Sequence, residues 1–121
     1  MDNMRRHTIS FSHAVQGLGY AVTTQPNFGI HLGISLIVVV AGWYLKLTST
    51  EWAIITATII FGLVIELLNT AIEATVDLVT LEIRPLAKIA KDCASGAMLV
   101  YAFGATVVGL VIFLPKIWLY F

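Results

Sequence analysis

The sequence predicts an all-α integral membrane protein, in which an amphipathic surface helix precedes three transmembrane helices. Of its 121 residues, 59% are hydrophobic and only 12% are charged, and the mean hydropathy is +0.91. Soluble domains are about 45–50% apolar and about 25% charged. A soluble chain this short could not bury so much apolar surface. Three predominantly apolar segments also reach the roughly 20 residues needed to cross a bilayer core.

Charge and cysteine content exclude several other classes of protein. The formal net charge is zero, so there is no electrostatic case for nucleic-acid binding. Cys93 is the single cysteine, which excludes an internal disulfide and leaves no cysteine spacing typical of a metal site.

We expect residues from about 5 to 24 to form the surface helix. Phe11, Val15, Leu18 and Val22 are spaced four, three and four apart, which gives a narrow apolar stripe on a helix. Such a helix is typical of one that lies in the membrane interface. A signal peptide is the alternative, but residues 8–25 lack the continuous apolar core that a signal peptide needs.

The three spans are expected at about 27–46, 50–79 and 92–115, within a single membrane-embedded domain covering residues 1–121. Ser49 or Thr50 is expected to cap the second helix. Pro85 marks a helix boundary between the second and third spans. Aromatic residues flank the spans, as they do at membrane interfaces.

The basic residues predict the orientation. In a three-span arrangement five lie on one side and two on the other, and the side richer in Lys and Arg faces the cytoplasm. The N-terminus and the segment 80–92 are therefore expected to be cytoplasmic. The five are Arg5, Arg6, Arg84, Lys88 and Lys91; the two are Lys46 and Lys116.

The second span carries an unusual polar stripe. In "ELLNTAIEATVD" (66–77), Glu66, Asn69, Glu73 and Asp77 fall within an arc of about 80° on one helix face. An ionised group near the bilayer centre costs roughly 2.5–3.5 kcal/mol. The stripe could specify helix packing through hydrogen bonds, line a proton or ion pathway, or form a cavity whose carboxylates hold Mg²⁺. No His follows Glu66 or Glu73 at the spacing of a di-iron site.

A second cluster follows in "AKIAKDCASGA", where Lys88, Lys91, Asp92 and Ser95 recur at helical spacing. Lys91 and the unpaired N–H groups of a helix start would attract a phosphate, whereas Lys88 is better explained as a cytoplasmic anchor. Acidic and basic clusters on one membrane face favour an anionic substrate bridged by a metal ion. From the residues alone, the chain is a metal-assisted membrane enzyme or a carrier.

The motifs "ELLNTAIEATVD" and "RPLAKIAKDCASGA", with "VQGLGYAVTTQPNFGIH" upstream, resemble the bacterial diacylglycerol kinase family, which includes the undecaprenol kinases. The resemblance covers nearly the whole chain. It implies a lipid kinase of the bacterial inner (plasma) membrane that moves the γ-phosphate of ATP to a lipid hydroxyl with Mg²⁺. It also implies a homotrimer whose active sites are shared between neighbouring protomers and face the cytoplasm.

The resemblance assigns the catalytic and lipid-binding roles to four residues. Glu66 would be the general base on the lipid hydroxyl, and Asn69 would orient the site. Asp92 would position the transferred phosphate, and Ser95 would lie near the lipid headgroup.

The resemblance assigns the nucleotide and metal roles to five more residues. Gly17 would let the adenine approach closely, Asp77 would meet the nucleotide, and Lys91 would neutralise phosphate charge. Glu73 would hold the metal together with Gln25, which stands where the family has a second glutamate. Loss of that negative charge predicts weaker metal affinity.

Two further positions depart from the family pattern, because Gly19 and Gly29 stand where basic residues are usual. The expected function, as the resemblance implies, is an ATP-dependent lipid kinase acting on undecaprenol or diacylglycerol. The alternative is a trimeric scaffold or pseudokinase of the same fold. A proton or cation carrier is the third possibility.

Overall fold

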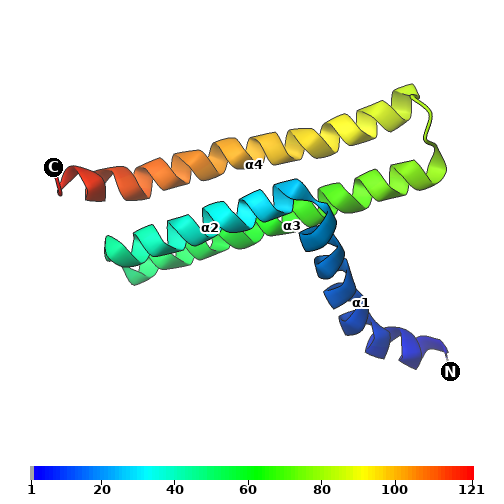
Figure 1. Cartoon of the computed structure of the whole chain (residues 1–121), viewed down its shortest axis with the longest axis horizontal. Helices are drawn as coiled ribbons and strands as arrows, with labels where there is room; N and C mark the ends of the chain where they lie inside the picture. Colours follow the sequence, from blue (N-terminus) through cyan, green and yellow to red (C-terminus); the bar gives the residue numbers. More distant parts are fainter. Residues whose placement is uncertain (1) are drawn as a thin grey trace.

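The chain folds into four helices, as the computed structural model shows for the backbone of residues 2–121 and the side chains of residues 10–121. Their bounds are Asp2–Thr24 (α1), Pro26–Tyr44 (α2), Ser49–Val79 (α3) and Pro85–Trp118 (α4), and the described residues form no strand. Helices α2, α3 and α4 run side by side as an antiparallel bundle, and α1 projects away from it (Figure 1). Each of these three helices is long and apolar enough to cross a membrane. The expected all-helical membrane fold is confirmed at this level.

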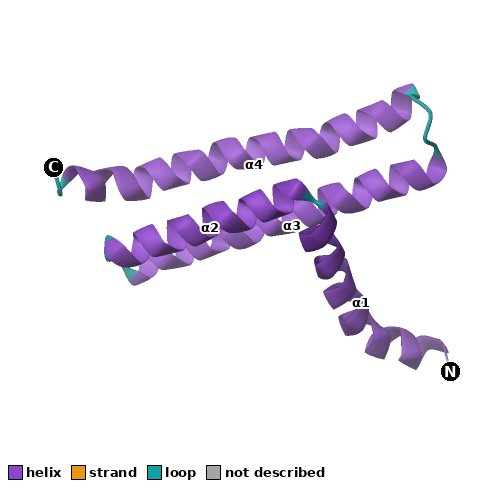
Figure 2. Cartoon of the chain, viewed as in Figure 1, coloured by secondary structure: helices purple, strands orange, loops and turns teal. Residues whose placement is uncertain are grey.

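Prolines and a capping box set the helix boundaries, and the connections are short (Figure 2). Pro26 and Pro85 each occupy the first turn of a helix, where the missing N–H is not needed. At the start of α3, Thr48 Oγ1 accepts from the Glu51 backbone N–H, and Glu51 accepts from the Thr48 N–H. The expected cap at Ser49 or Thr50 is therefore wrong. A glutamate three residues after Thr48 makes the reciprocal pair possible only there.

The fourth helix is longer than the span expected at 92–115. It begins at Pro85 and continues through Pro115 to Trp118. Lys88 and Lys91 thus lie on the first turns of α4 and not in a loop. Two basic side chains are thereby fixed at defined positions beside the end of α3.

Helix α3 packs against all three other helices and most extensively against α4. A small apolar cluster of Leu47, Ile55 and Ile112 closes the end of the bundle near the α2–α3 connection. At that end Lys116 Nζ pairs with Glu51 at 3.0 Å. Most other large apolar side chains are exposed on the isolated chain, as expected for helices whose outer faces contact lipid or further subunits.

The two ends of the bundle differ in charge. Arg84, Lys88 and Lys91 lie at the α3–α4 end, while Lys46 and Lys116 lie at the other. The side chains of Arg5 and Arg6 lie outside the described part of the chain. The orientation in the membrane stays a prediction.

Candidate active site

The most deeply buried polar group of the described chain is on α3. The side chains of Glu66 and Asn69 are 1% and 9% exposed, and they share one helix face with the buried residues Ile55 and Gly62. On this face apolar residues give way to polar ones after Gly62. Two of the four residues of the stripe expected from the sequence, Glu66 and Asn69, are therefore directed inward, against the other helices.

Both buried side chains carry an oxygen without a partner. Glu66 Oε2 and Asn69 Oδ1 are fully buried and accept no hydrogen bond within the chain. Buried polar atoms nearly always have a partner, and leaving one unpaired costs roughly 1–3 kcal/mol. The two oxygens therefore have acceptor capacity for a group that this chain does not supply, such as a hydroxyl.

Burial decreases along the stripe toward the α3–α4 connection. Glu73 is half-buried and lies within electrostatic reach of Glu66. Asp77, one turn further, is exposed and accepts from Lys91 Nζ at 2.7 Å. The stripe thus leads from the buried carboxylate of Glu66 to the exposed carboxylate of Asp77, which pairs with a cation.

The start of α4 forms a polar pocket beside the end of α3. This pocket has a volume of about 240 Å³, and its charged lining residues are Glu82, Arg84, Lys88, Lys91 and Asp92. Within it, Lys88 Nζ donates to Asp92 Oδ2 at 2.5 Å. Arg84 pairs with Glu82 and Lys91 with Asp77, so each of the three cations of this pocket already meets a carboxylate of the same chain. Lys88, which the sequence analysis explains as a cytoplasmic anchor, also pairs with the Asp92 carboxylate.

The remaining predicted site residues are not joined to this group within one chain. Gln25 precedes α2, and its side-chain Nε2 donates to Thr24 Oγ1 at 3.3 Å. Gly17 lies on α1 with open space where a Cβ would be, and Ser95 is exposed on α4. Among the described side chains, no hydrogen bond or ion pair links these three residues to the carboxylates. A single chain therefore supplies only part of the predicted site.

Glu73 and Gln25 carry oxygen atoms of the kind that Mg²⁺ takes, but no described contact joins the two residues within one chain. Residues 10–121 contain no group of three or more His, Cys, Asp or Glu that could hold a metal by themselves. Mg²⁺ in nucleotide sites usually takes one or two protein carboxylates and completes its shell with phosphate oxygens and water. Glu73 offers one such carboxylate, and Gln25 offers a neutral amide oxygen.

Three residues next to Glu66 were not predicted as part of the site. His31 of α2 and Tyr101 of α4 lie against α3 at Gly62, where an added Cβ would collide with both side chains. His31 lies within electrostatic reach of Glu66. The signal in the sequence was Gly62 itself, which precedes Glu66 by one helical turn on the polar face.

Three bilayer-length helices, a buried carboxylate on α3 and a pocket of mixed charge at the start of α4 are the features of a membrane protein with a polar site at one end of its bundle. The model of the prokaryotic diacylglycerol kinase family matches residues 12–113, and the chain belongs to that family. The expected enzyme class, a lipid kinase, is thereby confirmed.

Individual relatives carry two different names. The chain is 43% identical over 116 residues to the undecaprenol kinase of Bacillus subtilis. The aligned segment covers 96% of this chain and 94% of that protein. It is 43% identical over 110 residues to a diacylglycerol kinase of Synechocystis, covering 90% of this chain but only 63% of that longer protein. A diacylglycerol kinase of Helicobacter pylori is 35% identical over 88 residues, 73% of this chain and 69% of the relative.

Proposed function

We propose that this protein transfers the γ-phosphate of ATP to the hydroxyl of a membrane lipid, with Glu66 as the general base. The observation that carries the proposal is the unpaired Oε2 of Glu66, a buried carboxylate oxygen on a helix long and apolar enough to cross a membrane. A carboxylate that accepts no hydrogen bond is ready to accept the proton of an incoming hydroxyl. General bases contribute about 10²–10⁴-fold to rate.

Catalysis then requires the lipid hydroxyl and the γ-phosphate to be held in line. Glu66 takes the hydroxyl proton as the oxygen attacks the γ-phosphorus, while the bond from that phosphorus to the β-phosphate oxygen breaks and ADP leaves. The amide of Asn69, with its free Oδ1, lies one turn nearer the polar end and orients the acceptor. Ser95 on the exposed face of α4 contacts the lipid headgroup in a neighbouring protomer's site.

The nucleotide side of the site lies at the α3–α4 end. Lys91 neutralises phosphate charge, and Asp77 and Gly17 meet the nucleoside. Asp92, fixed by Lys88, positions the transferred group. Glu73 and Gln25 would hold Mg²⁺, which supplies charge neutralisation on the phosphates when bound.

The enzyme is proposed to act as a homotrimer in the bacterial inner membrane, with its site at the cytoplasmic leaflet. Two observations support the assembly: Gln25, Gly17 and Ser95 have no link to the carboxylates of their own chain, and the bundle leaves large apolar faces exposed. Phe11, Val15, Leu18 and Val22 on α1 are all exposed, which suits a helix lying on the membrane surface.

Undecaprenol is the proposed acceptor, with diacylglycerol as the alternative. The undecaprenol kinase relative is aligned over 94% of its own length, whereas the diacylglycerol kinase of Synechocystis, at the same 43% identity, is aligned over 63% of its length. Labelled phosphate transfer from ATP–Mg²⁺ in mixed micelles, offering each lipid separately, tests the choice. Transfer to neither lipid would favour the scaffold or pseudokinase alternative.

Replacing Gln25 with Glu is expected to tighten Mg²⁺ binding on the order of tenfold, because a full negative charge is added beside the metal. Binding of Mn²⁺ as a Mg²⁺ substitute, measured by electron paramagnetic resonance with a non-hydrolysable ATP analogue, reports this without turnover. Gln16→Glu adds the same charge to α1 and is the matched control. Equal affinities in Gln25→Glu and the wild type would contradict the metal assignment.

Replacing Lys91 with Gln is expected to raise the KM for ATP about tenfold, because a hydrogen bond to a charged group contributes about 1.5–3 kcal/mol. Folding should change little, since the Lys91–Asp77 pair is exposed and such pairs contribute about 0–1 kcal/mol. Initial rates at varied ATP check the first effect. Lys46→Gln, at the opposite end of the bundle, should leave the KM unchanged; a shared effect in both variants would refute a local role.

A further inference from the structure

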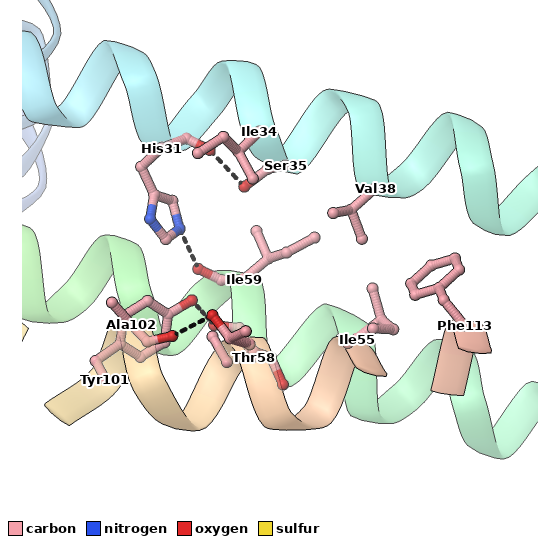
Figure 3. Close-up of a pocket in the computed structure, with 13 residues that line it drawn as sticks. His31, Ile34, Ser35, Val38, Ile55, Thr58, Ile59, Tyr101, Ala102 and Phe113 are labelled. Carbon is pink, nitrogen blue, oxygen red and sulfur yellow. Dashed lines mark hydrogen bonds between the residues drawn. The ribbon is translucent and has the colours of Figure 1, made fainter. Parts of the chain in front are cut away.

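A cavity of about 360 Å³ lies between α2, α3 and α4 (Figure 3). Three of its four hydroxyl groups are satisfied within their own helices: Ser35, Thr58 and Thr106 each donate to a carbonyl of the same helix at 2.8 Å. The remaining walls are mostly aliphatic. An apolar cavity of about 150 Å³ already takes up benzene, so this one has room for a hydrocarbon chain.

Two side chains close one end of this cavity. His31 Nε2 lies 3.3 Å from the Ile59 carbonyl oxygen, which can only accept, so Nε2 carries the hydrogen. The Tyr101 hydroxyl donates to the Thr58 carbonyl oxygen at 2.7 Å. The two ring centroids are 5.6 Å apart. Figure 3 shows both side chains reaching α3 at this end, while Phe113 and Ile55 lie at the other.

The closed end faces Glu66. His31 and Tyr101 lie over Gly62, because a Cβ there would collide with both. Gly62 and Glu66 are one turn apart, about 6 Å along α3, on the same buried face. The pair therefore separates the unpaired carboxylate oxygen from the apolar cavity.

We propose that His31 and Tyr101 form the floor of the acceptor site and determine which lipid alcohols the enzyme accepts. With the floor in place, a chain attached to the hydroxyl at Glu66 must leave sideways toward the bilayer and cannot continue into the cavity. Without the floor, a single unbranched alkyl chain could extend straight along α3 into the cavity and gain binding energy there. With the floor in place, such a chain loses this advantage over other lipids. This inference rests on the proposed role of Glu66 toward the acceptor hydroxyl.

The test compares acceptors within one preparation. The kcat/KM for 1-dodecanol is divided by the kcat/KM for the lipid that the wild type prefers, undecaprenol or diacylglycerol. Because both values come from the same sample, the ratio is independent of the fraction of folded enzyme. Tyr101→Ala is expected to raise it about tenfold or more, which corresponds to burying two or more methylenes.

Matched variants separate the floor from the cavity itself. Phe113→Ala enlarges the cavity at its far end and should leave the ratio within about twofold of the wild type. Tyr101→Phe keeps the ring over Gly62 and should behave like the wild type. His31→Ala removes the other half of the floor and should raise the ratio, so the test does not depend on one variant folding.

The outcomes distinguish this inference from the proposed function. An unchanged ratio in both Tyr101→Ala and His31→Ala, with transfer to the preferred lipid intact, would overturn the floor and leave the kinase assignment standing. An equal rise in Phe113→Ala would also overturn it. No transfer by the wild type to any alcohol would overturn the proposed function and the floor together.

Discussion

Replacing Glu66 with Gln is expected to lower kcat by about 10²–10⁴-fold, the usual contribution of a general base. Gln has nearly the shape of Glu, so packing around this 1%-exposed side chain should be preserved. What is lost is the ability to accept a proton. Phosphate transfer to the preferred lipid in mixed micelles measures the effect.

Nucleotide binding separates a chemical defect from a structural one. The dissociation constant of ATP–Mg²⁺ should change little in Glu66→Gln, because Lys91 and Asp77 lie about three turns away along α3 and at the start of α4. Glu51→Gln, on the same helix at the Lys116 end, is the matched control and should retain activity. A Glu66→Gln enzyme with more than about a tenth of the wild-type kcat would exclude the general-base role.

Replacing Gly62 with Ala is expected to destabilise the bundle by about 1–3 kcal/mol, the usual cost of overpacking a filled interior. Alanine favours a helix by about 1 kcal/mol over glycine, so the clash must exceed that gain. It should do so because the new Cβ meets two side chains, His31 and Tyr101, that are each bonded to α3. Unfolding by sodium dodecyl sulfate, followed by circular dichroism, gives the difference.

Gly104→Ala provides the matched control. It makes the same substitution in α4, where a Cβ meets nothing within 4 Å, and is expected to be neutral or slightly stabilising. Gly62→Ala should also lower activity more than it lowers the amount of folded protein, because displacing His31 disturbs the neighbourhood of Glu66. If both variants were equally stable, the close approach at Gly62 would be wrong.

The parts of the structure that depend on local sequence were largely predictable. Hydrophobic length located the three bilayer-length helices, and helical periodicity put Glu66 and Asn69 on one face, which the structure finds buried. Pro85 correctly marked a helix boundary. The cap of α3 was misplaced by one or two residues, since Ser49, Thr50 and Thr48 are equally good caps and only the geometry of Glu51 chooses among them.

Contacts between helices could not be predicted from periodicity. Lys88 and Asp92 are four residues apart and could have been paired on sequence grounds, but the meeting of Lys91 with Asp77 depends on how α4 lies against α3. The same holds for His31 and Tyr101, which come from different helices and meet over a glycine. A single histidine gives no sequence pattern that predicts such a partner.

The length of α3 has a consequence for where the reaction takes place. Its 31 residues extend about 46 Å, whereas the hydrocarbon core of a bilayer is about 30 Å thick. The helix is therefore longer than the hydrocarbon core, and its polar stripe lies in the half that ends at the α3–α4 connection. In the proposed reaction, the nucleotide would bind near the exposed end of α3 and the lipid hydroxyl near the buried Glu66 of the same helix. In this arrangement the nucleotide would stay in water and the lipid would stay in the membrane. The helix would set the distance between the two substrates.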